Sequence, residues 1–348
     1  MAGVWILRRG SEVVEVKVVA DSLTSDTFLN YNYTPVHPLV GLGAGTAMVA
    51  SPPSNAVQLL TLGDDGATPG DLIPTGSWPV SLAHWSEKNT VLVAQAGRDT
   101  IGFLDLSEGR IVDAIVVGNE PASIVLDRTD PEVTFAYVAI SGSDQVARVD
   151  LNAKKVVDVL SVGRDPRAMV FDSIRKRLFV ASLISSNAHP QGQVQETLVD
   201  PLTQKDIAVI DTSSFTISGW VHEVGTIIRG LLYDESTQRL IAAVSHANNQ
   251  DANISAESGP IDHVLISIDV DEESASAWSV LHEVNLTDQD SSGGPGASPF
   301  TMMLTPEADK LWVTLSAGRS ILTVDAQSFE ELARVETGHA PRGLMVHE

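Results

Sequence analysis

Short apolar runs alternate with polar turns along most of this chain. The runs are about four to eight residues long, rich in Val, Ile and Leu, and bounded by Gly, Asp, Ser and Pro, as in FAYVAISGSDQVARVD. This pattern is typical of β-strands joined by hairpins, because an amphipathic helix would need longer segments with a period of 3.6 residues. The chain is therefore predicted to be all-β.

A Gly-x-x-Pro signal recurs along the chain, and an apolar run follows it each time. It occupies residues 76–79, 118–121, 163–166, 296–299 and 338–341. Several of these signals lie 42 or 45 residues apart. Four short strands in a unit of this length match one blade of a β-propeller. The proline would open the innermost strand, where a missing N–H matters little, and the glycine would permit the tight passage between blades.

Residues 137–172, YVAISGSDQVARVDLNAKKVVDVLSVGRDPRAMVFD, resemble the YVTN-type β-propeller repeat of bacterial and archaeal surface-layer and periplasmic proteins. The resemblance extends over residues 76–172 and again from residue 296 to the end, and it is weaker across residues 182–286. It implies a propeller fold and a periplasmic or extracellular location. Because this family is defined by its fold, the resemblance says little about chemistry.

The repeat predicts a seven-bladed propeller formed by one domain, residues 1–348. Six nearly complete units begin near Pro35, Gly76, Gly118, Gly163, Gly225 and Gly296. A seventh unit begins at Gly338 and has only its first strand, while VWILRRGSEVVEVKVV near the start aligns with LWVTLSAGRSILTVDA. We therefore expect blades 1–6 within residues 31–337. Residues 1–30 and 338–348 would share the last blade and close the ring, which removes an open sheet edge. The alternative is an open array.

Two long polar segments, residues 184–205 and 246–262, interrupt the fourth and fifth units. Both are expected between the second and third strands of their blades, on the face that also carries the passages between blades. Long loops on a regular scaffold are often functional. Tolerated surface insertions are the alternative.

Charge and composition narrow the classes of partner. Asp and Glu number 45 against 22 Lys and Arg, which gives a net charge of −23. Such a chain is a poor match for nucleic acid or for anionic lipid. There is no cysteine, which excludes disulfides, Cys–zinc sites and covalent c-type haem. No apolar run approaches the roughly 18 residues of a membrane span, no signal peptide is visible, and no cofactor is indicated.

Arginines and histidines map to the face with the long loops. The candidate ligand-binding residues are Arg98, Arg164, Arg167, His189, Arg229, His246, His263, Arg319, His339 and Arg342. Arg167, Arg229 and Arg342 occupy equivalent positions of their repeats and should point near the central channel. Arginine forks suit a carboxylate or phosphate. In the alternative, each arginine pairs with Asp99, Glu120, Asp144 or Asp165 and ties blades together.

Motifs for metals and catalysis are weak. Asp288 and Asp290 resemble the start of a calcium loop, but Pro299 stands where the final glutamate belongs. Whether they bind calcium stays open, and a turn between blades explains them better. The histidines have no metal-ligand spacing, so no metal is assigned. The chain also has no G-x-S-x-G, P-loop or H-E-x-x-H motif.

Three functions fit these observations. The first is a binding or scaffold propeller that recognises a protein partner or a small anionic ligand at the loop-bearing mouth of the channel. The second, implied by the resemblance, is a lyase or lactonase-like enzyme in which Arg167, His189, His246 and His263 do acid–base work. The third, also implied by the resemblance, is a docking component for a haem protein in an electron-transfer system.

Overall fold

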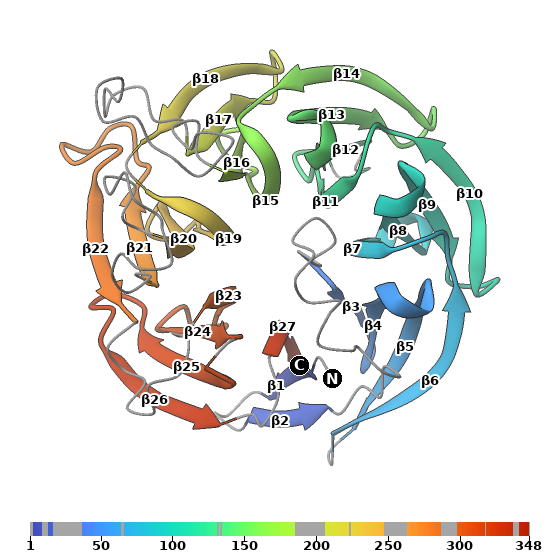
Figure 1. Ribbon diagram of the computed structural model, residues 1–348, viewed down its shortest axis with the longest axis horizontal. Helices are drawn as coiled ribbons and strands as arrows, with labels where there is room; N and C mark the ends of the chain where they lie inside the picture. Colours follow the sequence, from blue (N-terminus) through green and yellow to red (C-terminus); the bar gives the residue numbers. More distant parts are fainter. Residues whose placement is uncertain are drawn as a thin grey trace, which may run out of the picture. The chain divides into compact units, whose positions relative to one another are not determined.

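The computed structural model describes residues 3–8, 13–16 and 37–347, apart from residues 64–65, 131, 133, 185–205, 223, 247–262, 287–297, 317 and 337–340. The chain forms two compact units: Met1–Ser161 together with Thr337–Glu348, and Val162–Glu336. Each unit contains three four-stranded antiparallel sheets whose strands follow one another along the chain (Figure 1), and the first unit also contains a sheet formed by the two chain ends. We call each such sheet a blade. The single-domain organisation of residues 1–348 stays a prediction.

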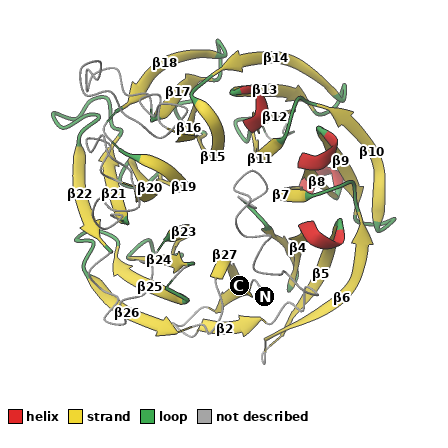
Figure 2. Ribbon diagram, in the orientation of Figure 1, coloured by secondary structure: helices red, strands yellow, loops and turns green. Residues whose placement is uncertain are grey.

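The first unit contains three blades. Blade 1 consists of β3 (Leu39–Gly43), β4 (Thr46–Ser51), β5 (Ala56–Gly63) and β6 (Gly66–Pro74). Blade 2 consists of β7 (Pro79–Trp85), β8 (Thr90–Gln95), β9 (Thr100–Asp105) and β10 (Arg110–Val116). Blade 3 consists of β11 (Pro121–Leu126), β12 (Phe135–Ile140), β13 (Gln145–Asp150) and β14 (Lys155–Ser161). The turns between second and third strands of these blades are short 3-10 helices, drawn red in Figure 2.

The second unit contains the other three blades. Blade 4 consists of β15 (Arg164–Asp172), β16 (Arg177–Ile184), β17 (Ile207–Asp211) and β18 (Thr216–Val221). Blade 5 consists of β19 (Thr226–Asp234), β20 (Arg239–His246), β21 (Val264–Asp269) and β22 (Val280–Asn285). Blade 6 consists of β23 (Pro299–Leu304), β24 (Lys310–Leu315), β25 (Ser320–Asp325) and β26 (Glu331–Glu336).

The two chain ends share one sheet, as the sequence predicts, but that sheet is not a complete blade. It has three strands in the order β2 (Val13–Val16), β1 (Gly3–Arg8), β27 (Pro341–His347). In the six blades the second strand runs antiparallel to the first, whereas β1 runs parallel to β27. The described residues therefore form six complete blades, and the expectation of seven is wrong: the terminal strands pair in a different direction, and residues 17–36 lie outside the description.

Burial follows the position of each strand within its blade. All six residues of β8 are buried, and β12 and β24 each have five buried residues. The fourth strand β10 instead alternates between exposed and half-buried positions. Middle strands covered on both faces are continuously apolar, and a strand with one solvated face alternates.

The meander places the connections of each blade at two opposite edges. The passage that leads into a first strand and the turn between second and third strands share one edge, here called the loop edge. The turns between first and second and between third and fourth strands share the other, here called the turn edge. The segments 185–206 and 247–263 both join a second strand to a third. Their expected place in blades 4 and 5 is confirmed, and both begin and end at the loop edge of the second unit.

No helix within the described parts of the chain is long and apolar enough to cross a membrane. The helical residues in blades 1–3 belong to single 3-10 turns of three residues each.

Neighbouring first strands of the second unit approach so closely that one position must be glycine. A Cβ atom on Gly230 in β19 would overlap the backbone carbonyl oxygen of Phe300 in β23. A Cβ on Gly219 in β18, by contrast, would meet nothing within 4 Å. We expect Gly230→Ala to lower the free energy of unfolding by about 3 kcal/mol, because a backbone atom cannot move aside. Gly219→Ala should change it by less than about 0.5 kcal/mol. Denaturant unfolding of both variants tests the comparison.

Acid should weaken the first unit through His84 in β7. Burial lowers the pKa of His84 below its ordinary value, and the nearby Arg128 adds to this effect. Arg128 Nη2 also donates a hydrogen bond to the His84 carbonyl oxygen at 3.0 Å. The unfolded chain therefore binds a proton more readily than the folded one, so stability is full above about pH 6.5 and falls as the pH drops below it. We expect the free energy of unfolding, measured with urea, to fall less between pH 7.5 and 5 in His84→Gln than in the unchanged protein. An unchanged pH dependence in the variant would contradict the assignment.

Candidate functional site

The passages into the first strands share one backbone conformation. The residue directly before the proline position is left-handed in blades 2 to 6: φ is 60° at Trp78, 56° at Glu120, 50° at Asp165, 56° at Ile227 and 44° at Ser298. Such values are uncommon for any residue except glycine, and for the β-branched Ile227 they are a clear outlier. The Gly-x-x-Pro signal is therefore a defined turn that aims the chain into the first strand.

A β-bulge follows each of these turns. The pairing of first and second strands skips a residue between Pro79 and Ser81, between Pro121 and Ser123, and between Ile228 and Gly230. Blades 4 and 6 show the same irregularity after Pro166 and Pro299. A bulge turns one side chain out of the regular alternation of a strand, and bulges are common beside binding sites. We call the residue after the proline position the bulge residue. It is the unpaired residue in blades 2, 3 and 5, and it lies within the irregular stretch in blades 4 and 6.

The chemistry of the bulge residue differs between the two units. Blades 2 and 3 carry the buried apolar residues Val80 and Ala122. Blades 4, 5 and 6 carry Arg167, Arg229 and Phe300. The equivalence of Arg167 and Arg229 that the sequence predicts is thus confirmed by the bulges of β15 and β19.

Arg167 is a buried partner of Asp165. Only 4% of Arg167 is exposed. Its Nε lies 2.9 Å from Oδ1 of Asp165, and its Nη2 donates to Oδ2 at 3.3 Å. The two side chains form an ion pair in which the Nη2 contact is a hydrogen bond and the Nε contact is a close approach of opposite charges. Arg167 thus pairs with one of the acidic residues named in the alternative. Both partners lie in β15, so this ion pair holds the start of one strand and does not tie two blades together.

Arg229 is in a different environment. Its side chain is half-buried, and its guanidinium carbon lies over the ring of Phe300, 5.9 Å from the centroid. The first strands β15, β19 and β23 are neighbours within this unit, so the bulge residues of three consecutive blades line one stretch of the loop edge. A guanidinium over an aromatic face is stabilised by the ring's quadrupole and keeps its donors in the plane of the group.

A second repeated position, directly before the third strand, holds the passages in place. In blade 1 the Asn55 carbonyl accepts from Thr75 N at 2.9 Å, and its side chain accepts from Trp78 N at 2.9 Å. In blade 2 Asp99 accepts in the same way from Val117 N and Glu120 N, at 2.9 and 3.0 Å. We call this position the latch. It gives hydrogen-bond partners to backbone groups that would otherwise lack them.

Two of the predicted ligand-binding residues stand at the latch of their blades. His263 is buried, and its carbonyl accepts from Leu286 N at 2.7 Å. Arg319 precedes β25 with φ of 48° and is exposed. In blade 4 the latch is Asp206, whose Oδ2 accepts from Val224 N at 2.9 Å. The backbone of His263 therefore has a structural task.

Comparisons with known proteins agree with this architecture. No family model matches the chain, and no curated protein does. Solved structures do match. Hydrazine synthase of Kuenenia stuttgartiensis is 17% identical, with a TM-score of 0.69 over 89% of this chain and 88% of that one. A functionally unknown protein from Desulfotomaculum acetoxidans DSM 771 is 11% identical, with a TM-score of 0.63 over 88% and 87%. A chain of a nidogen/laminin complex is 14% identical, with a TM-score of 0.53 over 84% and 95%.

The fold is an all-β propeller. At these identities the likeness shows the fold alone, and it carries no chemistry over to this chain.

The remaining candidate residues of the propeller divide into described and undescribed ones. Arg98 is exposed in the turn between β8 and β9, and its Cδ would lie 2.8 Å from a Cβ atom on Gly76. Arg164 is half-buried at the start of β15. His246 ends β20 and Arg342 lies in β27, but the description does not include their side chains. The other predicted residues outside the described part are His189, His339, Asp288 and Asp290.

The described residues contain no group of three or more His, Asp or Glu side chains that could hold a metal ion. Sequence reasoning missed the latch residues Asn55 and Asp206 and the aromatic partner Phe300. Aligning the repeats would have revealed all three, because each occupies a fixed distance from a strand boundary. What the alignment could not show is which atoms these residues contact.

The pairing of Asp165 with Arg167 predicts a large loss of stability when only one partner is changed. Asp165→Asn keeps a residue that tolerates the left-handed backbone but removes the charge. We expect it to lower the free energy of unfolding by about 3 kcal/mol, because the guanidinium stays buried without its counter-ion. The double variant Asp165→Asn/Arg167→Met should lose less than the sum of the single variants. Strict additivity in denaturant unfolding would contradict the pairing.

Proposed function

We propose that this protein is a binding or scaffold propeller that recognises a protein partner or a small anionic ligand at the loop edge of its blades. The observation that carries the proposal is Arg229, which stands half-buried at a bulge with its guanidinium over Phe300. Bulges and aromatic supports are means by which a scaffold orients a charged side chain.

The distribution of charge supports an anion as the ligand. Asp and Glu outnumber Lys and Arg by 45 to 22 in the whole chain, yet Arg164, Arg229 and Arg319 all stand at the loop edge of the second unit. Arg167 is buried against Asp165. The proposal assigns direct contact with the ligand to Arg229 and Arg164, because both are half-buried at the loop edge. Carboxylate and phosphate groups match the planar fork of arginine.

We infer further that the blades belong to the YVTN type and that the protein works in the periplasm or outside the cell. The support is the sequence of residues 137–172. Within this repeat Tyr137 is buried and donates to Asp127 Oδ2 at 2.7 Å, which gives the aromatic residue of the motif a structural task.

Titration with citrate and with inorganic phosphate at constant ionic strength tests the anion site. Calorimetry should show binding to the protein, and Arg229→Gln should weaken it roughly tenfold or more, since a hydrogen bond to a charged group contributes about 1.5–3 kcal/mol. Gln keeps a polar side chain while removing the charge.

Arg334→Gln is the matched control. Arg334 lies in β26 of the same unit, where its Nη2 is 3.2 Å from Glu331 Oε2. It is not one of the proposed ligand-binding residues, so its substitution removes a positive charge from the unit without changing the proposed site. It should leave the affinity unchanged. No binding of either anion, or equal weakening by both substitutions, would overturn the small-anion form of the proposal. An acidic peptide of repeated Asp and Glu, titrated in the same way, tests the protein-partner form.

A further inference from the structure

The turn edge of blades 4 and 5 departs from the pattern of the other blades. In the turn between third and fourth strands, one left-handed residue donates its N–H to the carbonyl of the aspartate that begins the turn. Gly109 does so in blade 2 at 2.8 Å, Phe329 in blade 6 at 3.0 Å and Trp278 in blade 5 at 2.7 Å. Phe329 is only 2% exposed, whereas Trp278 is 36% exposed. The same structural position thus buries its aromatic ring in one blade and presents it to solvent in another.

The blade 5 turn is also longer and acidic. Asp105 and Gly109 are four residues apart, and Asp269 and Trp278 are nine apart. The extra residues include Asp271, Glu272 and Glu273.

Internal hydrogen bonds order this longer turn. Asp269 Oδ2 accepts from the Ser276 hydroxyl, and Asp271 N donates to Asp269 Oδ1 at 2.9 Å. Burial favours a raised pKa for Asp269, but hydrogen bonds from Ser274 and Ser276 outweigh it and lower the pKa of this carboxyl. The aspartate therefore stays ionised and keeps the turn in one conformation.

A second departure lies in the turn between β15 and β16. There Asp172 Oδ1 accepts from Ile174 N, as Asp127 Oδ1 accepts from Thr129 N in blade 3. Blade 5 has Ser236 in the same hydrogen bond. Ile174 is thus an apolar residue at a position that is polar in those blades, and 64% of it is exposed.

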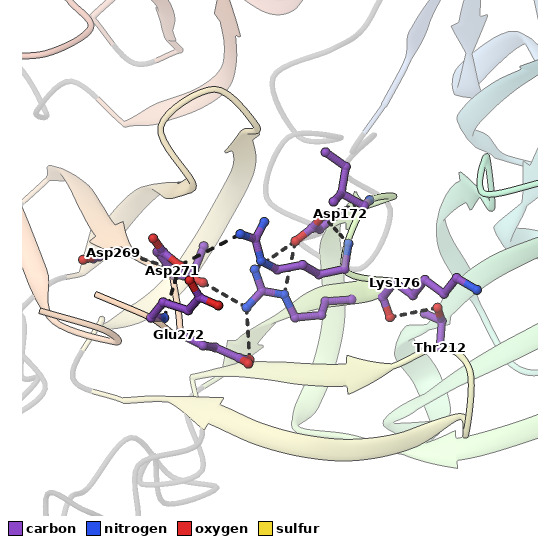
Figure 3. A network of polar contacts seen from close by, with 11 residues as sticks. Asp172, Lys176, Thr212, Asp269, Asp271 and Glu272 are labelled. Carbon is purple, nitrogen blue, oxygen red and sulfur yellow. Dashed lines mark hydrogen bonds and ion pairs between the residues drawn. The ribbon is translucent and has the colours of Figure 1, made fainter. Parts of the chain in front are cut away.

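Arginines join the two turns into one surface. Arg175 Nη2 lies 3.9 Å from Asp271 Oδ1. The buried Arg177 donates to the Val270 carbonyl at 2.9 Å, and its Nη1 lies 3.2 Å from Glu272 Oε1. Figure 3 shows Asp271 and Glu272 beside these contacts. We call Ile174, Asp271, Glu272, Glu273 and Trp278 the Trp278 patch.

Arg177 also supports the exposed ring. Its guanidinium lies 5.3 Å from the centroid of Phe179 and 5.9 Å from that of Trp278. Nη2 of Arg177 is 2.9 Å from Asp172 Oδ2, a carboxylate that is fully buried. The tryptophan is therefore held on a fixed platform instead of on a free loop.

We propose that the Trp278 patch docks a second protein through a basic segment that carries an apolar anchor residue. Tryptophan is enriched among the residues that contribute most to binding in protein interfaces. The exposed Ile174 lies on the turn that Arg175 and Arg177 connect to the turn of Trp278. The surrounding carboxylates set the charge of the partner: 59% of the Glu272 side chain is exposed, and Glu273 is exposed as well. A second copy of this chain, at a net charge of −23, has the wrong sign.

Titration with synthetic peptides tests the docking. The probe is a twelve-residue peptide (about 4 nm when extended) with lysines on both sides of a central leucine pair. One comparison peptide replaces the leucines with glycines, and another replaces the lysines with glutamates. Calorimetry at about 0.1 M salt should show binding of the lysine–leucine peptide, with weaker binding of the glycine peptide and none of the glutamate peptide.

The repeat itself supplies substitutions that the fold accepts. Trp278→Gly copies Gly109 of blade 2, and Ile174→Thr copies Thr129 of blade 3. Each should weaken binding of the lysine–leucine peptide roughly tenfold or more, and Leu332→Thr, at an exposed position of β26, should not. If Ile174→Thr, at its largely exposed site, binds as well as the unchanged protein, or if the glycine peptide binds as tightly as the leucine peptide, the proposal is overturned. Arg229→Gln should leave this affinity unchanged, which separates the patch from the loop-edge site.

Discussion

The latch hydrogen bonds are the interaction on which the rest of this structure depends. Each passage between blades contains a left-handed residue that is not glycine, a conformation that costs about 1–3 kcal/mol. In blades 1 and 2, Asn55 and Asp99 accept two passage N–H groups each, and these bonds hold Trp78 and Glu120 in their left-handed conformations. The passage in turn sets where the proline and the bulge fall. In blades 1 and 2, a short polar residue before the third strand thus holds the passage that leads into the next first strand.

This arrangement gives the propeller one adjustable position in each blade. Because the bulge residue lies outside the regular pairing, its side chain can change without disturbing the ladder. Val80 and Ala122 use the position for the core, Arg167 uses it for a buried ion pair, and Arg229 stacks on Phe300. The neighbouring position is strictly limited in blade 5, where Gly230 lies against the backbone of β23. In β19, a position whose residue varies between blades is thus followed directly by a position that must be glycine.

The two edges of the second unit are chemically distinct. The loop edge gathers arginines, whereas the turn edge of blades 4 and 5 carries acidic residues around Trp278. The special features of each edge are recognised by comparing a blade with its neighbours. Equivalent hydrogen bonds show which residues correspond, even where a turn is longer in one blade. In a repeat protein the common pattern reports what the fold requires, and a local exception points to another use of the surface.

The strand pattern, the repeat length and the Gly-x-x-Pro signal determined the all-β propeller, the six complete repeat units and the position of the long segments, because these features depend on local periodicity and on turn chemistry. The same pattern wrongly predicted a seventh blade from the two chain ends. The sequence also identified Arg167 and Arg229 as equivalent. Only the tertiary structure decided that Arg167 pairs with Asp165, that His263 and Arg319 stand at latch positions, and that β1 runs parallel to β27. These outcomes depend on which atoms meet across turns and between distant parts of the chain, and periodicity carries no record of such contacts.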